Sequence, residues 1–175
     1  MAEVVIDTNV LLVASQRHHD VSPQCVLACI ERLERIQKNE CVVIDKAFEI
    51  LGEYQRKLDT RTGKGPGEAF LKWLLQNKAN PNKVHQVALT KHADHDYAEF
   101  PDPALADQFD PPDRKYVAVA YAHPSKPPVL QAADSKWLRW QSQLQAHGIR
   151  VEFPCPQDIR RFFQKKFPGE VPPPL

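Results

Sequence analysis

The chain lacks the features of a membrane protein and of a secreted one. No apolar run approaches the roughly 18 residues that a membrane-spanning helix requires. The first residues, Met1 to Glu3, carry no basic segment of the kind that opens a signal peptide. We therefore expect a cytoplasmic protein that does not associate with a membrane.

Cysteine is scarce, and its spacing excludes the common metal motifs. The four cysteines are Cys25, Cys29, Cys41 and Cys155, and none of them forms a CxxC pair. A structural zinc site usually needs two such pairs of ligands. Without a secretion signal, we expect buried, reduced thiols.

The chain also lacks an excess of charge of one sign. Its formal net charge is +1, whereas proteins that bind nucleic acid often carry a basic excess. An acidic catalytic centre would offset basic residues elsewhere in the chain. The near-neutral total therefore leaves a nucleic-acid substrate open without arguing for one.

Short apolar runs alternate with segments of helical periodicity along the chain. The runs predict buried strands at Val4–Ile6, Cys41–Ile44, Pro128–Gln131 and Arg150–Phe153, with an edge strand at Lys83–Leu89. Helical spacing predicts helices over Thr8–Gln16, Pro23–Lys38, Asp45–Leu58, Glu68–Gln76, Asp113–Ala122, Asp134–Gln145 and Gln157–Lys166. This alternation predicts an α/β fold, a three-layer sandwich with a central, mostly parallel sheet.

The remaining segments set the expected boundaries. Residues 90–112 are polar, acidic and proline-bearing, which predicts a long loop with one helical turn near Leu105. No linker or internal repeat divides the chain, so we expect one domain over residues 1–167. Residues 168–175 contain four prolines and form a predicted proline-rich tail.

Four acidic residues stand near predicted strand ends or in the helices that follow them. Asp7 ends the first strand, Asp134 follows a later strand, Asp113 opens a helix, and Glu53 lies within the helix after the second strand. The carboxyl ends of parallel strands meet at one edge of a sheet, where sites form. Clustered carboxylates repel one another unless a cation joins them. Mg²⁺ and Mn²⁺ prefer such oxygen ligands, although each acid alone also suits a helix N-terminus.

The motifs around these acids resemble those of the PIN-domain (PilT N-terminus-like) nucleases. The segment VVIDTNVLL at 4–12 is similar to the opening strand and DTN motif of that family. The segment GEY at 52–54, with Leu58, resembles the acid in the helix after the second strand. The segments DPPDRKYVAVA at 110–120 and VLQAADS at 129–135 resemble the later acidic motifs, so the likeness extends from Val4 to about Phe163.

The resemblance implies a metal-dependent endoribonuclease that cleaves RNA with Mg²⁺ or Mn²⁺. It implies that Asp7, Glu53, Asp113 and Asp134 are catalytic acids that bind the metal. Thr8 and Asn9 would support them through hydrogen bonds. Many relatives are toxins paired with an inhibitory antitoxin protein, often as homodimers, and others process RNA.

The sequence departs from the family pattern at one position and leaves alternatives at two others. Many relatives carry a further Asp where this chain has Lys136, which leaves the number of bound metals open. Lys136, Arg114 and Lys64 are the cations that we expect to contact nucleic acid. Asp110 is the alternative to Asp113, and Glu49 is the alternative to Glu53.

The sequence also fits two other functional hypotheses. Lys136 and the near-neutral charge also fit a catalytically weak or inactive PIN-like module that binds RNA or a protein. A less favoured alternative is a phosphatase or response-regulator-like domain with Asp7 as nucleophile. We prefer the nuclease hypothesis because it also explains an acid within the helix after the second strand, Glu53, and a late acid at a strand end, Asp134.

Overall fold

The computed structural model describes residues 1–175 and confirms the α/β fold. The central sheet has five strands, all parallel, in the order β3-β2-β1-β6-β7. Its strands are β1 (Ala2–Ile6), β2 (Glu40–Asp45), β3 (Val84–Val87), β6 (Val129–Leu130) and β7 (Val151–Glu152). A separate antiparallel hairpin consists of β4 (Lys91–Ala93) and β5 (Asp96–Tyr97).

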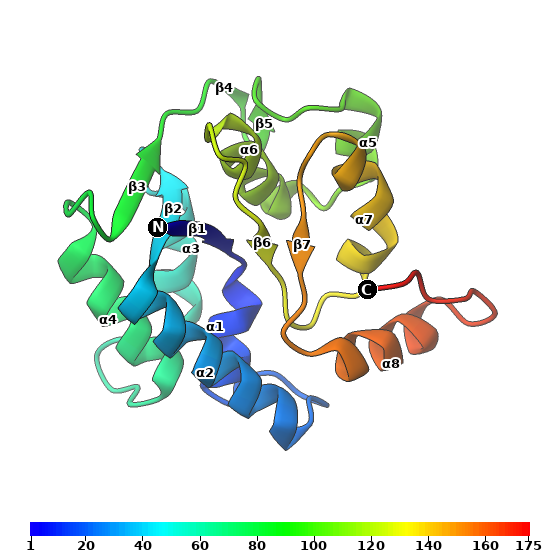
Figure 1. Ribbon diagram of the computed structural model, residues 1–175, viewed down its shortest axis with the longest axis horizontal. Coiled ribbons are helices and arrows are strands. Elements are labelled where there is room, and N and C mark those ends of the chain that lie inside the picture. The colour runs from blue at the N-terminus through cyan, green and yellow to red at the C-terminus, as the bar shows by residue number, and fades with distance from the viewer.

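Helices flank the sheet, and the chain reverses direction across it once. They are α1 (Thr8–Ala14), α2 (Pro23–Asn39), α3 (Glu49–Lys57), α4 (Pro66–Asn77), α5 (Pro103–Gln108), α6 (Arg114–Ala122), α7 (Lys136–Ala146) and α8 (Pro156–Lys166), with a 3₁₀ helix at Pro111–Asp113. From β1 the chain moves outward to β2 and β3, then crosses back to β6 and β7. Right-handed crossovers place helices on opposite faces when this direction reverses. Figure 1 accordingly shows α1 to α4 gathered on one side and α5 to α7 on the other.

The local sequence explains why the strands at the centre are buried. Val4, Val5 and Ile6 of β1 are fully buried, as are Val42 and Val43 of β2. A parallel strand covered on both faces needs such a continuous apolar run rather than an alternating one. One hydrophobic core joins these strands to α1, α2, α3, α4, α6 and α7.

Asp45 was expected to begin a helix, and that expectation is wrong. Asp45 is the last residue of β2, and α3 starts only at Glu49. The buried Asp45 carboxylate accepts hydrogen bonds from the backbone N–H groups of Glu49 (2.8 Å) and Ile50 (2.9 Å). It therefore satisfies the free amides at the start of α3, although it stands at a strand end like the candidate site acids.

Residues 90–112 are more ordered than the predicted loop. They contain the hairpin β4–β5 as well as helix α5, which matches the predicted helical turn near Leu105. Asp102 caps α5 by accepting hydrogen bonds from the amides of Ala104 and Leu105. The hairpin was missed because its strands are only three and two residues long and carry no apolar alternation.

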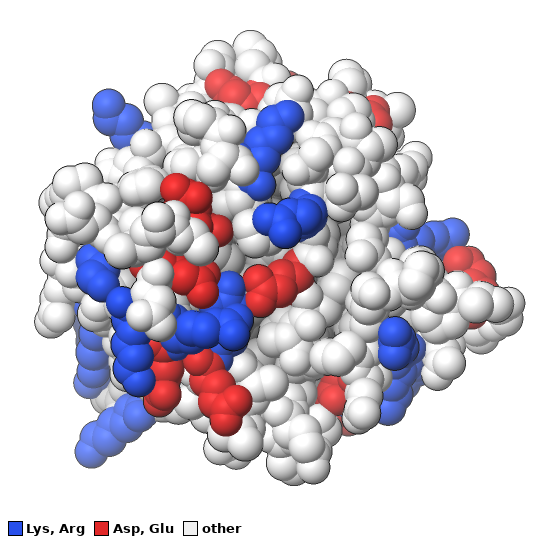
Figure 2. Space-filling view, viewed as in Figure 1, with Lys and Arg blue, Asp and Glu red and all other residues white.

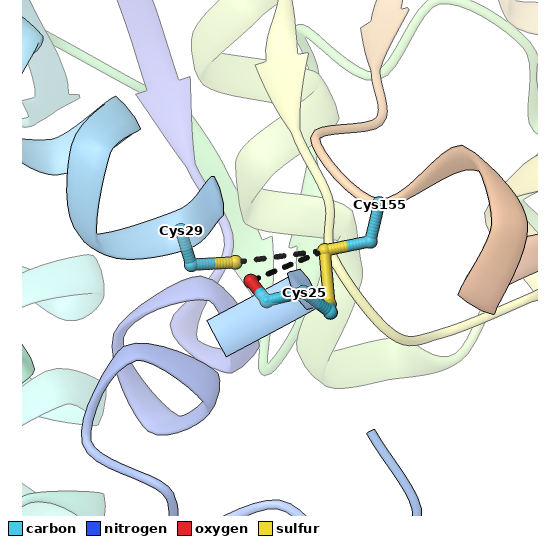
Figure 3. A group of neighbouring side chains, drawn as sticks. All are labelled: Cys25, Cys29 and Cys155. Carbon is cyan, nitrogen blue, oxygen red and sulfur yellow. Dashed lines mark hydrogen bonds between the residues drawn. A yellow bond between two sulfur atoms is a disulfide. The ribbon is translucent and has the colours of Figure 1, made fainter. Parts of the chain in front are cut away.

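Two of the cysteines are joined, which corrects the expectation that all four thiols are reduced. Cys25 of α2 and Cys155, just before α8, form a disulfide. All four cysteines are buried as expected, and Cys29 and Cys41 are free. Figure 3 shows the Cys29 thiol beside this bond, with its Sγ 3.9 Å from the Sγ of Cys155. The partners are 130 residues apart, so only the packing of the β7–α8 connection against α2 brings them together.

No helix of the protein combines the length and the hydrophobicity that crossing a membrane would require.

Candidate metal centre

Asp7 lies at the point where the strand order reverses. It directly follows β1, and its backbone N–H donates to the carbonyl of Leu130 in β6 at 3.0 Å. The reversal between β1 and β6 is where open α/β sheets form their ligand sites. The side chain is buried, and its Oδ1 accepts the backbone N–H of Asn9 at 2.9 Å. Asp7 is therefore both the N-cap of α1 and a carboxylate held at the switch point.

A hydrogen-bonded turn holds Asp134 on the other side of this point. The side chain of Asn9 donates to Oε1 of Gln131 and accepts the N–H of Ala132 at 3.0 Å. The same Gln131 oxygen accepts the backbone N–H groups of Ala133 (3.2 Å) and Asp134 (3.1 Å). The Asn9 side chain thus couples the start of α1 to the turn that carries Asp134.

Asp110, Asp113 and Asp134 converge closely enough to share one cation. One carboxylate oxygen from each lies within 4.8 Å of the other two. In an octahedral Mg²⁺ site, oxygen ligands are up to about 4.2 Å apart, so a small contraction would bring the three around one ion. Asp110 and Asp113 stand at the two ends of one 3₁₀ turn, so the proposed alternatives for the third acid lie side by side here.

Glu53 is the predicted acid whose charge is already balanced. Thr8 and Tyr116 both donate their hydroxyl groups to its Oε2. The ammonium group of Lys115 lies 3.3 Å from its Oε1. Burial raises the pKa of Glu53, but the two hydrogen bonds and the charge of Lys115 outweigh it, and the pKa is lowered. Both carboxylate oxygens therefore have protein partners.

The aspartates near Glu53 have the opposite electrostatic balance. Burial raises the pKa of Asp7 to about 7, and the charges of Glu53 and Asp134 add to this, while the Asn9 amide opposes it. Burial and the charges of Asp7, Asp134 and Glu53 raise the pKa of Asp113 to about 8. Burial also raises the pKa of Asp134. Negative charge is concentrated here beyond what the neighbouring cations offset, and a divalent ion would relieve it.

The three cations expected to contact nucleic acid do not form one surface. Lys136 forms an ion pair with Asp110, beside the aspartate cluster. Arg114 follows Asp113 directly and donates to the carbonyl of His95 at 3.4 Å. Lys64 is exposed in the α3–α4 connection, where Gly65 lies against Ser15 at the far end of α1 from Asp7. The face seen in Figure 2 likewise shows acidic and basic side chains interspersed rather than one basic patch.

Glu49, the alternative to Glu53, has other partners. Its carboxylate oxygens lie 2.6 Å from Nζ of Lys91 and 2.5 Å from the hydroxyl of Tyr97, which donates to it. These contacts tie α3 to the β4–β5 hairpin. Glu53 is the acid of α3 whose charge acts on the pKa of Asp7 and Asp113.

Sequence reasoning did not single out Lys115, Tyr116 or Gln131. Lys115 is buried, and Gln131 is completely buried. One signal was available for Lys115, because it is a charged residue next to the otherwise apolar segment Tyr116–Ala120. Gln131 offered a similar signal as a polar residue between Leu130 and Ala132. Such polar residues inside apolar runs need buried partners.

Comparisons of this chain with protein-family models, with curated proteins and with solved structures found no match. The candidate site therefore stands on its own geometry and chemistry.

Proposed function

We propose that this protein is a metal-dependent endoribonuclease of the PIN-like kind, with Mg²⁺ or Mn²⁺ as cofactor. The observation that carries the proposal is the convergence of Asp110, Asp113 and Asp134, whose carboxylate oxygens lie within 4.8 Å of one another. Asp7 lies close enough for its charge to raise the pKa of Asp113. The raised pKa values of Asp7 and Asp113 indicate that the neighbouring cations do not fully balance these carboxylates.

The residues divide into those that would hold the metal and those that position them. Asp113 and Asp134 would bind it, with Asp110 as a further ligand and Asp7 near the same site. Glu53 is held by Thr8, Tyr116 and Lys115. Its negative charge would contribute to the electrostatic potential at the ion. Asn9 and Gln131 would keep the Asp134 turn in place. A metal held by these residues would supply activation of a water molecule and neutralisation of charge on the scissile phosphate.

The near-neutral surface favours a short contact with the RNA backbone over a long basic track. Lys136 is partly exposed and stands at the edge of the cluster. It is therefore the cation best placed to meet a phosphate of the substrate. The antitoxin partner and the homodimer that the family resemblance implies remain predictions, as do the phosphate contacts expected of Arg114 and Lys64.

A second candidate function is a PIN-like module that binds RNA or protein without cleaving it. The ion pair between Lys136 and Asp110 favours this alternative, because an internal cation already neutralises one of the possible ligands. The aspartyl-phosphate chemistry considered for Asp7 is less well supported. Asp7 is buried, and a nucleophilic carboxylate must reach an incoming phosphoryl group.

The test is cleavage of single-stranded RNA by the purified full chain with Mn²⁺ or Mg²⁺, and with EDTA. Asp134→Asn and Asp7→Asn should each lower the metal-dependent rate at least a hundredfold. Asp107→Asn, at an exposed position of α5, is the matched control and should leave the rate unchanged. Equal rates for wild type and Asp134→Asn would refute the proposal. Metal binding without any cleavage would favour the non-cleaving module.

A further inference from the structure

A second group of metal-binding side chains lies at the other end of the sheet. Glu3 is near the start of β1, whose far end precedes Asp7. His85 is the second residue of β3, and His123 directly follows the last residue of α6. Three segments that are distant in the sequence thus contribute one side chain each.

The two imidazole rings approach each other through their nitrogen atoms. Nδ1 of His85 lies 3.2 Å from Nε2 of His123, and the ring planes are nearly parallel, with an interplanar angle of 9°. A carboxylate oxygen of Glu3 and one ring nitrogen of each histidine lie within 4.8 Å of one another. Glu3 and His85 are partly exposed, so an ion from solution can reach the group.

This spacing suits a tetrahedral zinc ion. Two Zn–N bonds of about 2.0–2.1 Å at a tetrahedral angle separate the nitrogens by about 3.3 Å. The observed 3.2 Å differs little from that value. A hydrogen bond between the rings would give the same distance, so the experiment below is designed to separate the two.

Ser125 contacts two of the three side chains. Its hydroxyl donates to Oε2 of Glu3 at 3.0 Å and lies 2.9 Å from Nδ1 of His123. The backbone N–H of Ser125 also donates to Nδ1 of His123 at 3.2 Å, so Nδ1 is the acceptor nitrogen of the ring here. Metal binding at Nε2 would require the ring proton to move to Nδ1, where the Ser125 hydroxyl oxygen can accept it. One serine thus holds the side chains of His123 and Glu3 beside each other.

We propose that Glu3, His85 and His123 form a zinc-binding site distinct from the aspartate cluster. Two imidazoles and one carboxylate are a typical zinc ligand set, and three protein ligands leave a fourth position for water or an added ligand. The carbonyl groups at the C-terminal end of α6 add a favourable field for a cation at His123. The aspartate cluster offers only oxygen, which suits Mg²⁺ or Mn²⁺ instead.

The two sites are far enough apart to be studied separately. Asp113 precedes α6 and His123 follows it, with nine helical residues between them. At 1.5 Å per residue, this places their backbones roughly 13 Å or more apart. The zinc site does not depend on the proposed nuclease function.

The test is calorimetric titration with ZnCl₂ in the Asp113→Asn/Asp134→Asn background, which removes two ligands of the other cluster. The background protein and its His92→Asn control, at an exposed position of the hairpin, should bind one equivalent of Zn²⁺. Adding Ser125→Ala should weaken binding by about 10- to 100-fold, the usual effect of losing an outer contact. Adding His85→Asn or His123→Asn should weaken it further.

A second measurement distinguishes a metal site from a hydrogen bond between the rings. Co²⁺ bound to this site in the background protein should give the visible absorption of a four-coordinate ion, and His123→Asn should abolish it. Each variant is first checked for an unchanged circular dichroism spectrum. Folded background protein that binds no Zn²⁺, or that binds it equally well without His85 and His123, would overturn the proposal.

Discussion

The ammonium group of Lys115 lies 3.3 Å from Oε1 of Glu53, with both side chains buried. This pair divides the acidic site into two parts. Glu53 has a counter-charge and two hydroxyl donors, and its pKa is lowered. Asp7 and Asp113 lack a comparable partner, and their pKa values are raised to about 7 and about 8. The Glu53 carboxylate is therefore kept ionised by its partners, whereas a bound cation would stabilise the ionised forms of Asp7 and Asp113.

Lys115→Met should destabilise the protein by about 3 kcal/mol, because it leaves the Glu53 charge buried without its counter-ion. The free energy of unfolding in urea measures this. Lys72→Met, at an exposed position of α4, is the control and should have little effect. Adding Glu53→Gln to Lys115→Met should recover part of the loss. Equal stability of Lys115→Met and the control would contradict the role assigned to the pair.

The metal-free protein should lose stability as the pH rises from 6.5 to 8.5. The folded pKa values of Asp7 and Asp113, about 7 and about 8, exceed the ordinary value of 3.8. The fold therefore holds protons that the unfolded chain has released, and this stabilisation is lost as pH rises through the folded pKa values. His123, whose pKa is lowered, has the opposite effect but acts mainly below pH 6.5.

Thermal unfolding in EDTA at both pH values measures this effect. Saturating Mn²⁺ should reduce or reverse the difference, because the ion replaces the protons. Asp113→Asn should flatten the pH dependence of the metal-free protein. A melting temperature that rises with pH in EDTA would show that the cluster is not electrostatically strained.

Asn9→Ala should weaken Mn²⁺ binding by about 10- to 100-fold, as expected when a residue that orients a ligand is lost. The change removes the bonds from Asn9 to Gln131 and Ala132, so the turn carrying Asp134 loosens. Calorimetric titration with Mn²⁺ measures the affinity, and Gln143→Ala, exposed on α7, is the control. Unchanged affinity would mean that the turn holds Asp134 without Asn9.

Lys136→Met should strengthen Mn²⁺ binding, because Asp110 loses the cation that now pairs with it. The pair is partly exposed, so the gain should be a few fold, corresponding to about 1 kcal/mol or less. The same titration measures this gain. Lys165→Met, exposed on α8, is the control. Weaker Mn²⁺ binding by Lys136→Met would contradict the hypothesis that Lys136 competes with the ion for Asp110.

Reducing the Cys25–Cys155 disulfide should destabilise the protein by about 2–4 kcal/mol, because the bond closes a long loop of the unfolded chain. Thermal unfolding with and without a reductant measures this effect. Cys25→Ser should have the lower melting temperature already and should not respond to reductant. The Cys29 thiol, whose pKa burial raises to about 12, should react only slowly with alkylating agents in either state. No effect of reductant on the wild type would argue against the bond.

Much of the fold could be predicted from local patterns. Apolar runs such as Val4–Ile6 predicted buried strands because a strand covered on both faces has no room for charge. Helical spacing predicted α2 and α4 to within a few residues at each end. The parallel direction of the strands followed from the alternation of strands and helices along the chain. The helix start predicted at Asp45 was wrong, and the β4–β5 hairpin was not predicted. A helix cap and a three-residue strand depend on contacts outside their own segment.

The sequence by itself determined that Asp7 and Asp134 stand at strand ends, because each directly follows or closely follows an apolar run. Only the tertiary structure decided that Asp110 joins Asp113, that Lys115 and Tyr116 hold Glu53, and that Lys136 pairs with Asp110. The same holds for the disulfide and for the pairing of His85 with His123. Strand and helix periodicities are local, whereas the partner of a buried charge, thiol or imidazole depends on helix phase and on which distant segments pack together.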